Sequence, residues 1–211
     1  MTASDFPDEI PDVDHESVPW PKQGDRLFIS TGSAYEAPIA SESAERLYHI
    51  MEGYKDAADI LVAHTEKVPS HRRRLVYPIV YCYRHYLEIA LKGLIISHGP
   101  AVNVALVAKD HNLFGLWRKF RTIVEAHGQG DATDGNDKPL DAVEANIKEF
   151  NKLDPAAMTF RYHATTKDKQ FTGVPHSVDL AELKRVMDNI WMLLEAADMS
   201  LEHSSVPPDH E

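Results

Sequence analysis

Cysteine is almost absent from this chain of 211 residues, and it has no long apolar run. The single Cys82 lies inside a short apolar stretch, so no intramolecular disulfide can form, and a small buried side chain in a reducing compartment is predicted. No segment reaches the roughly 18 consecutive apolar residues that span a membrane. The N-terminus is acidic and proline-rich, unlike a secretion signal. We therefore expect a soluble, cytoplasmic protein without membrane contact.

The motifs of several enzyme classes are also missing. The sequence has no convincing glycine-rich phosphate loop, Ser-His-Asp order or Cys-x-x-Cys pair, which argues against nucleotide kinases, hydrolases and redox enzymes. His85 and Glu88 have a spacing that metal sites use. Metal sites in helical bundles recruit matched acids and histidines from several helices, and no second such pair falls on a predicted core face. We expect neither a metal nor a cofactor.

Basic residues are lacking at both ends of the chain. Residues 1–17 and 201–211 hold nine of the 33 acidic residues and no Lys or Arg. The body therefore carries 24 acidic and 22 basic residues, although the whole chain has a formal charge of −11. Basic side chains gather at 71–74 and 118–121. They are either solvated helix ends or contacts for phosphate groups.

The distribution of proline, acid and apolar residues predicts one domain between two tails. Residues 1–25 form a disordered, acidic and proline-rich arm in this interpretation, and residues 204–211 a disordered tail. Residues 26–203 are expected to form an all-α, up-and-down bundle of four to five helices, with a small hairpin or loop insert before the last helix. Apolar spacing, caps and helix stops place the helices at 41–66, 70–97, 112–127, 140–152 and 179–201.

The most informative stretch, residues 81–92, is apolar on nearly every side of a helix but carries a narrow polar stripe. Arg84, Glu88 and Lys92 follow at intervals of four, and His85 precedes Glu88 by three, so these side chains share one sector of the helix. Ionised groups are costly to bury unless they are paired. The stripe is therefore either a structural salt-bridge ladder or the floor of a functional site.

Two later motifs accompany the stripe. His111-Asn112-Leu113 opens the predicted third helix, and Phe160-Arg161-Tyr162 precedes the last one. In this order the elements resemble those of the HEPN superfamily of prokaryotic helical domains, over residues 41–203. The resemblance implies an up-and-down bundle, often dimeric, that belongs to toxin–antitoxin, phage-defence or RNA-processing systems.

The resemblance also implies a nuclease motif. Active HEPN proteins are metal-independent RNA endonucleases that use an Arg and a His separated by four to six residues and brought together across a dimer. In this sequence the spacing occurs at Arg121 and His127. The pair lies at the end of the predicted third helix, whereas the family usually keeps it near the final helix.

The candidate site follows from the chemistry of RNA cleavage without metal, which needs a base, an acid and a cation near pH 7. Such a site requires the segment before the last helix to fold over the middle of the second helix. The candidate catalytic residues are then His111, Arg161 and His85, with His163 close by in sequence, and the pair Arg121 and His127. The candidate residues for binding substrate or phosphate are Arg84, Glu88, Lys92, Arg161 and Tyr162.

The same residues also fit a purely structural arrangement. Glu88 would pair with Arg84 or Lys92, and Arg161 would form a buried ion pair with Glu88. His111 would cap the third helix. Two functions therefore stay open. The first is an RNA- or nucleotide-associated domain of a bacterial defence, toxin–antitoxin or stress system, with a cognate antitoxin or defence partner and, if it is an enzyme, with metal-independent RNase activity. The second is a non-catalytic helical homodimer that acts as an interaction or scaffold module.

Overall fold

The computed structural model describes residues 21–107, 110–131, 138–155, 157–164 and 167–204. The chain divides into two units, residues 1–39 and 40–211. The predicted boundary between arm and bundle, at residues 25 and 26, falls inside the first unit. Most of the predicted arm and nearly all of the predicted tail lie outside the described residues.

Helices dominate the second unit, and the described residues contain no strand, which confirms the predicted all-α class. The segment before the last helix is a loop of turns rather than a hairpin in its described part. Two short 3₁₀ turns, η2 (Pro69–His71) and η3 (Gly99–Val102), flank the second helix. The five α-helices are α1 (Ser43–Lys67), α2 (Arg72–His98), α3 (Leu113–Ala126), α4 (Pro139–Leu153) and α5 (Leu180–Ser204).

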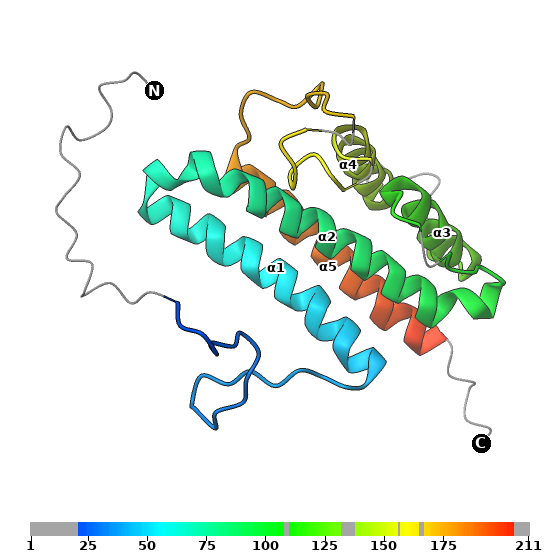
Figure 1. Ribbon diagram of the computed structural model, residues 1–211. Coiled ribbons are helices and arrows are strands. Elements are labelled where there is room, and N and C mark those ends of the chain that lie inside the picture. The colour runs from blue at the N-terminus through cyan, green and yellow to red at the C-terminus, as the bar shows by residue number, and fades with distance from the viewer. Residues whose placement is uncertain (1–20, 108–109, 132–137, 156, 165–166, 205–211) are drawn as a thin grey trace. The chain divides into compact units, whose positions relative to one another are not determined.

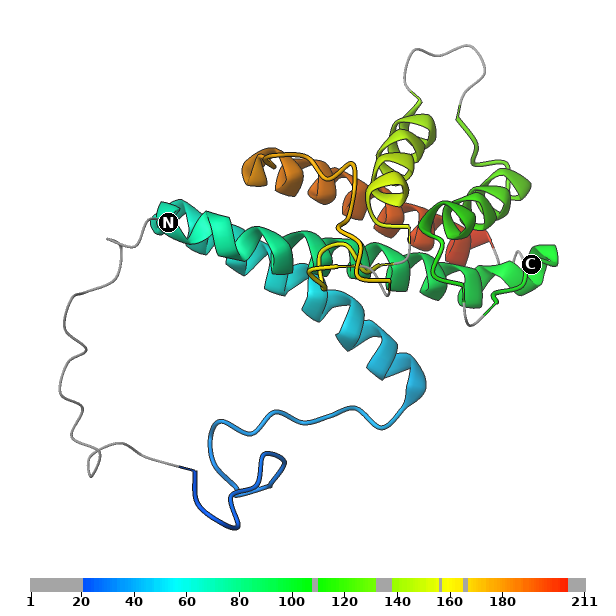
Figure 2. The same ribbon diagram turned by 45° about the horizontal axis from the view of Figure 1, so that its top comes forward.

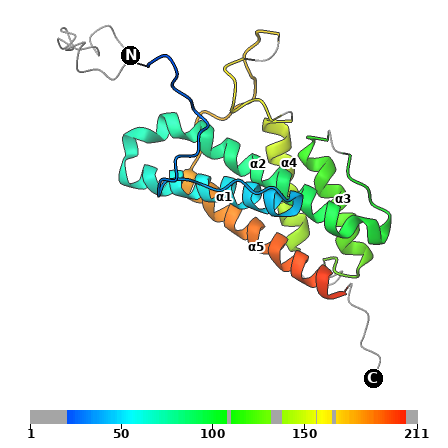
Figure 3. The same ribbon diagram turned by 60° about the horizontal axis from the view of Figure 1, so that its bottom comes forward.

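Helix α2 is the central element, because it packs against α1, α3 and α5. Helices α1 and α2 run antiparallel, and α5 lies against both of them (Figures 1 and 3). Pro78 lies within α2, which continues through it. The side chains of α2 that are completely buried include Ile79, Tyr83, Tyr86, Leu87 and Leu91.

A buried polar network joins α1, α2 and α5. The ammonium of Lys55 donates to Asp59 and to Asp188, each at 2.8 Å. The hydroxyl of Tyr83 donates to the other oxygen of Asp59 at 2.5 Å. Lys55 is only 7% exposed, so the two carboxylates balance a charge that would otherwise be costly to bury.

Helices α3 and α4 pack against each other, and α3 packs on α2 (Figure 2). The buried side chains of α3 include Trp117 and Phe120, which lie 5.4 Å apart between ring centroids. The start of α4 differs from the prediction. The spacing of Asp141 and Glu144 predicts a capping box that Asp141 begins, but Asp131 instead accepts hydrogen bonds from the backbone N–H groups of Leu140 and Asp141, so this predicted cap is wrong.

Candidate functional site

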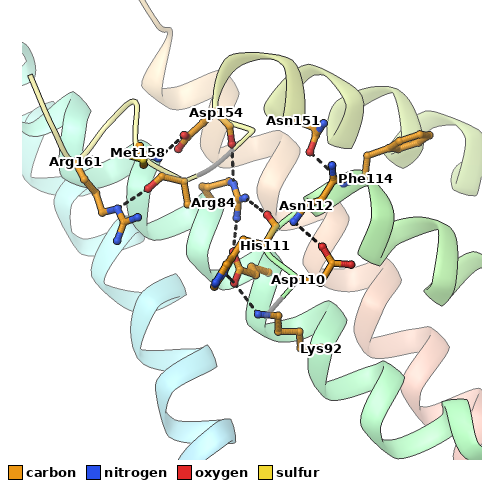
Figure 4. Close-up of polar contacts among 12 residues, drawn as sticks. Arg84, Lys92, Asp110, His111, Asn112, Phe114, Asn151, Asp154, Met158 and Arg161 are labelled. Atoms are coloured by element: carbon orange, nitrogen blue, oxygen red, sulfur yellow. Dashed lines mark hydrogen bonds and ion pairs between the residues drawn. The ribbon is translucent and has the colours of Figure 1, made fainter. Parts of the chain in front are cut away.

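Arg84 links α2 to two loops and is completely buried. Its Nη1 donates to Glu88 at 2.8 Å, and its Nη2 donates to the carbonyl oxygen of His111 at 2.8 Å. Its Nε reaches the carbonyl oxygen of Asp154 at 3.5 Å. Figure 4 shows Arg84 between the segment that carries His111 and the loop that leads to Arg161. One guanidinium therefore positions both loops against the middle of α2.

Glu88 is the buried anion of the site, with 3% of the residue exposed. One carboxylate oxygen accepts from Arg84, and the other accepts from Lys92 at 2.9 Å and from His111 at 2.8 Å. Burial opposes ionisation, but the hydrogen bonds from Lys92, His111 and Arg84 outweigh it and lower the pKa of Glu88 to about 2. Glu88 is therefore ionised at neutral pH.

His111 is bound at one ring nitrogen, and most of its side chain is exposed. Its Nδ1 lies 2.8 Å from Oε1 of Glu88, while 61% of its side chain is exposed. An ionised carboxylate has no hydrogen to donate, so Nδ1 must carry the hydrogen of this bond. This arrangement fixes the ring and leaves Nε2 free to exchange a proton with a bound molecule. The expected helix cap by His111 is wrong, because Asn112 caps α3 by accepting from Gly115 at 2.7 Å.

Arg161 lies on the loop between α4 and α5 and does not pair with Glu88, contrary to the structural alternative considered above. Its Nε donates to the carbonyl oxygen of Ala157, and its guanidinium carbon lies 5.2 Å from the ring centroid of Tyr81 and 5.4 Å from that of Tyr162. Arg161 and Tyr162 are both exposed. The guanidinium therefore presents its charge at the surface while two aromatic rings hold it.

His85 lies between the buried stripe and this aromatic group. Its ring stacks on Tyr81 at 5.6 Å between centroids and meets the edge of Tyr54 at 4.4 Å. Burial lowers the pKa of His85; the carboxylate of Glu88 opposes this shift, whereas Arg84 and Arg161 add to it. His85 is therefore neutral at pH 7 and suited to hydrogen bonding or stacking rather than to donating a proton.

The structure thus gathers most of the predicted site residues at one place. One hydrogen-bonded network contains Arg84, Glu88, Lys92 and His111. The positive charge of Arg161 contributes to the lowered pKa of His85. His163 is exposed. Sequence reasoning missed Asp154, which accepts from the backbone N–H groups of Met158 and Thr159 and so shapes the loop that carries Arg161. The Asp-Pro step that ends α4 was the only signal for it.

Arg121 and His127 do not belong to this network. Arg121 donates to Glu125, Asp141 and Glu144, the last at 2.9 Å, and these acids raise its pKa. Nδ1 of His127 lies 2.9 Å from the carbonyl oxygen of Ile123. The structure gives no contact between the two side chains. Any catalytic use of this pair needs a second chain or a rearrangement.

Among the residues that the structure describes, no group of three or more His, Cys, Asp or Glu side chains is placed to hold a metal ion. None of the described helices is both long enough and apolar enough to cross a membrane. Comparison with known proteins finds no family model, no curated protein and no solved structure that matches this chain. The proposal of a function therefore rests on the site itself.

Proposed function

We propose that this chain is an RNA- or nucleotide-associated HEPN-like domain of a bacterial defence, toxin–antitoxin or stress system, and that it cleaves RNA without a metal at His111. The observation that supports this proposal is the pairing of a buried, ionised Glu88 with the exposed ring of His111. A buried carboxylate that orients a histidine is a common way to prepare a general base.

The proposed reaction begins when Nε2 of His111 takes the proton of a ribose 2′-hydroxyl. The 2′-oxygen attacks the neighbouring phosphorus, and the bond from phosphorus to the 5′-oxygen breaks. Water protonates the leaving 5′-oxygen, and the hydroxide that remains takes the proton from Nε2 of His111, which restores the neutral ring. The products are a 2′,3′-cyclic phosphate and a 5′-hydroxyl. Arg161 stabilises the negative charge of the pentacoordinate phosphorus, while the rings of Tyr81 and Tyr162 support its guanidinium.

The roles of the remaining residues follow from their exposure. Lys92 is partly exposed and adds positive charge beside the phosphate. Tyr162 is 53% exposed and offers its ring to a base. Arg84 and Glu88 are buried, so they position His111 rather than touch the substrate.

The test is incubation of the purified protein with labelled single-stranded RNA in the presence of EDTA. The expected product carries a 2′,3′-cyclic phosphate, and His111→Ala lowers the cleavage rate by about 10²-fold or more. His49→Ala is the matched control, because His49 is equally exposed and also faces a glutamate, but that glutamate is on the surface. Equal activity of wild type, H111A and H49A would exclude His111 as the base.

Arg121 and His127, which the family resemblance singles out, are tested in the same assay. Arg121 is held by three carboxylates, so we expect Arg121→Ala and His127→Ala to retain cleavage if the site lies at His111. Loss of cleavage in these two variants with full activity in H111A would move the catalytic centre to this pair.

A second candidate function is a non-catalytic interaction or scaffold module. The observation that favours it is the complete burial of Arg84, whose donors are occupied by Glu88 and by the carbonyl oxygens of two loops. Arg161→Ala separates the two functions. Loss of RNA binding at an unchanged melting temperature supports the RNA site, whereas a large fall in melting temperature without any RNA binding by the wild type supports the scaffold.

We also propose that the chain forms a homodimer through α2 and α5, and that a cognate antitoxin or defence protein binds it. Support for the dimer comes from exposed apolar side chains on these helices, which include Ile96, Met192 and Met199. Light scattering on the purified protein gives its mass directly. A mass of one chain at micromolar concentration contradicts the dimer.

A further inference from the structure

A pocket of about 400 Å³ lies between α1, α2 and α5, away from the residues of the His111 site. Figure 3 shows the three helices that form it side by side. Most of its wall is apolar, and Gly93 of α2 leaves room opposite Leu47. The apolar side chains of the wall include Leu47, Met51, Ala90, Leu94 and Leu194.

The charged residues of this wall are all acidic. Among the residues that the structure describes, Glu195 and Asp198 line the pocket and no Lys, Arg or His does. Asp198 lies 2.5 Å from Nε2 of His98, but Glu195 has no ion-pair partner among the described residues. Burial raises the pKa of Glu195, and the charges of Glu52 and Asp198 raise it further.

Glu52 of α1 is not among the residues that line the pocket, but its charge acts on Glu195 and on Tyr86. Burial raises its pKa, Asp56 adds to the shift, and the charge of Lys55 opposes it. Lys55 itself donates to Asp59 and Asp188, so it does not form a salt bridge with Glu52. Oε1 of Glu52 is buried without a hydrogen-bond partner.

Tyr86 is a second and independent feature of this pocket. Its side chain is completely buried and lines the pocket, and its hydroxyl has no hydrogen-bond partner. Burial raises the pKa of this hydroxyl, and the nearby charges of Glu52 and Glu195 contribute. A buried hydroxyl without a partner has lost its hydrogen bonds to water and gained none in return. The lining of the pocket therefore includes a carboxylate without an ion-pair partner, Glu195, and a hydroxyl without a hydrogen-bond partner, Tyr86.

We propose that this pocket binds a small organic cation, namely a primary alkylammonium. Its N–H donors match the carboxylate of Glu195 and the hydroxyl oxygen of Tyr86, which line the pocket, and its alkyl chain lies against Leu47 and Leu94. A hydrated metal ion fits less well, because the remaining wall offers few polar ligands to such an ion. This inference is independent of the RNA site.

The experiment is a titration of the full chain with n-pentylamine, followed by calorimetry and by thermal unfolding, at a pH where both glutamates are ionised. n-Pentanol has the same chain without the charge and is the matched control ligand. We expect saturable binding of the amine that is at least tenfold tighter than that of the alcohol, and a rise in melting temperature with the amine alone.

Three variants locate the ligand. Glu195→Gln and Tyr86→Phe are each expected to weaken binding of pentylamine at least tenfold, and Y86F retains its fold because it removes only an unpaired hydroxyl. Glu202→Gln, at an exposed carboxylate on the same helix but outside the pocket, leaves binding unchanged. Equal binding of amine and alcohol, no saturable binding of the amine, or a loss in E202Q equal to that in E195Q would overturn the proposal.

Discussion

At the residue scale, Glu88 shows how a buried carboxylate can stabilise the fold and orient a histidine at once. Its two carboxylate oxygens accept hydrogen bonds from Arg84, Lys92 and His111. Glu88→Gln leaves the completely buried Arg84 without its anion, so we expect the free energy of unfolding at pH 7 to fall by about 3 to 5 kcal/mol. Urea unfolding measures this loss.

The pH dependence of that loss has a definite sign. The pKa of Glu88 is lowered to about 2 from an ordinary value of 4.5, so its contribution is complete above pH 4.5 and disappears as the pH falls towards 2. The difference between wild type and E88Q should therefore shrink over this range. Glu45→Gln, at an exposed glutamate of α1, is the control and should change stability by less than about 1 kcal/mol at pH 7.

For Glu52 we expect the opposite dependence of stability on pH. A carboxyl whose pKa is raised by folding destabilises the folded chain once the pH exceeds its unfolded value of 4.5. In the absence of an added amine, Glu52→Gln should therefore raise the melting temperature at pH 7 and have little effect below pH 4. A melting temperature at pH 7 that falls in E52Q would show that an anion at this position stabilises the fold.

At the scale of single elements, two glycines of α2 and η3 differ in what surrounds them. A Cβ atom on Gly99 would overlap the carbonyl oxygen of Val104, whose N–H donates to the Gly99 carbonyl at 2.9 Å. A Cβ atom on Gly93 would meet only Leu47, at an ordinary 3.6 Å. We expect Gly99→Ala to lower the free energy of unfolding by about 1 to 3 kcal/mol.

Gly93→Ala should instead raise the free energy of unfolding by about 0.5 to 1 kcal/mol, because alanine favours a helix interior. Denaturant unfolding of the two variants side by side checks both signs. If G99A unfolds at the same denaturant concentration as the wild type, the turn after α2 does not require the close approach at Gly99.

Local sequence patterns were sufficient to predict the helices, but they predicted only part of the candidate site. Apolar periodicity predicted all five α-helices to within a few residues at each end. The intervals of four between Arg84, Glu88 and Lys92 predicted their salt bridges, because helix geometry alone brings such side chains together.

Contacts between distant segments could not be predicted in the same way. The bond from His111 to Glu88 spans 23 residues, and the placement of Arg161 over Tyr81 spans 80. Both contacts depend on the paths of the loops after α2 and α4. The spacing of residues within one helix does not predict these paths. The cap of α4 by Asp131, rather than by Asp141, has the same cause.

At the scale of the whole helical unit, Lys55 of α1 contributes to the packing of α5. It contacts Asp188 of α5, which lies 133 residues further along the chain. Its ammonium is shared by Asp59 of α1 and Asp188 of α5, and it lies 5.4 Å from the ring centroid of Trp191. Lys55→Met keeps a similar length and removes one of the two ammonium groups that pair with these carboxylates, while Lys184 remains at 3.5 Å from Asp59 and 2.6 Å from Asp188. We expect the free energy of unfolding at pH 7 to fall by about 1.5 to 3 kcal/mol, because each carboxylate loses a hydrogen bond from a charged donor.

Lys148→Met is the matched control for this substitution. Lys148 also pairs with a glutamate, at 2.6 Å, and lies 5.2 Å from an aromatic ring, but it is largely exposed. Its replacement should cost no more than about 1 kcal/mol. If K55M and K148M unfold at the same urea concentration, the buried network does not hold α5, and docking must come from the apolar contacts of Met187, Ile190 and Leu194 alone.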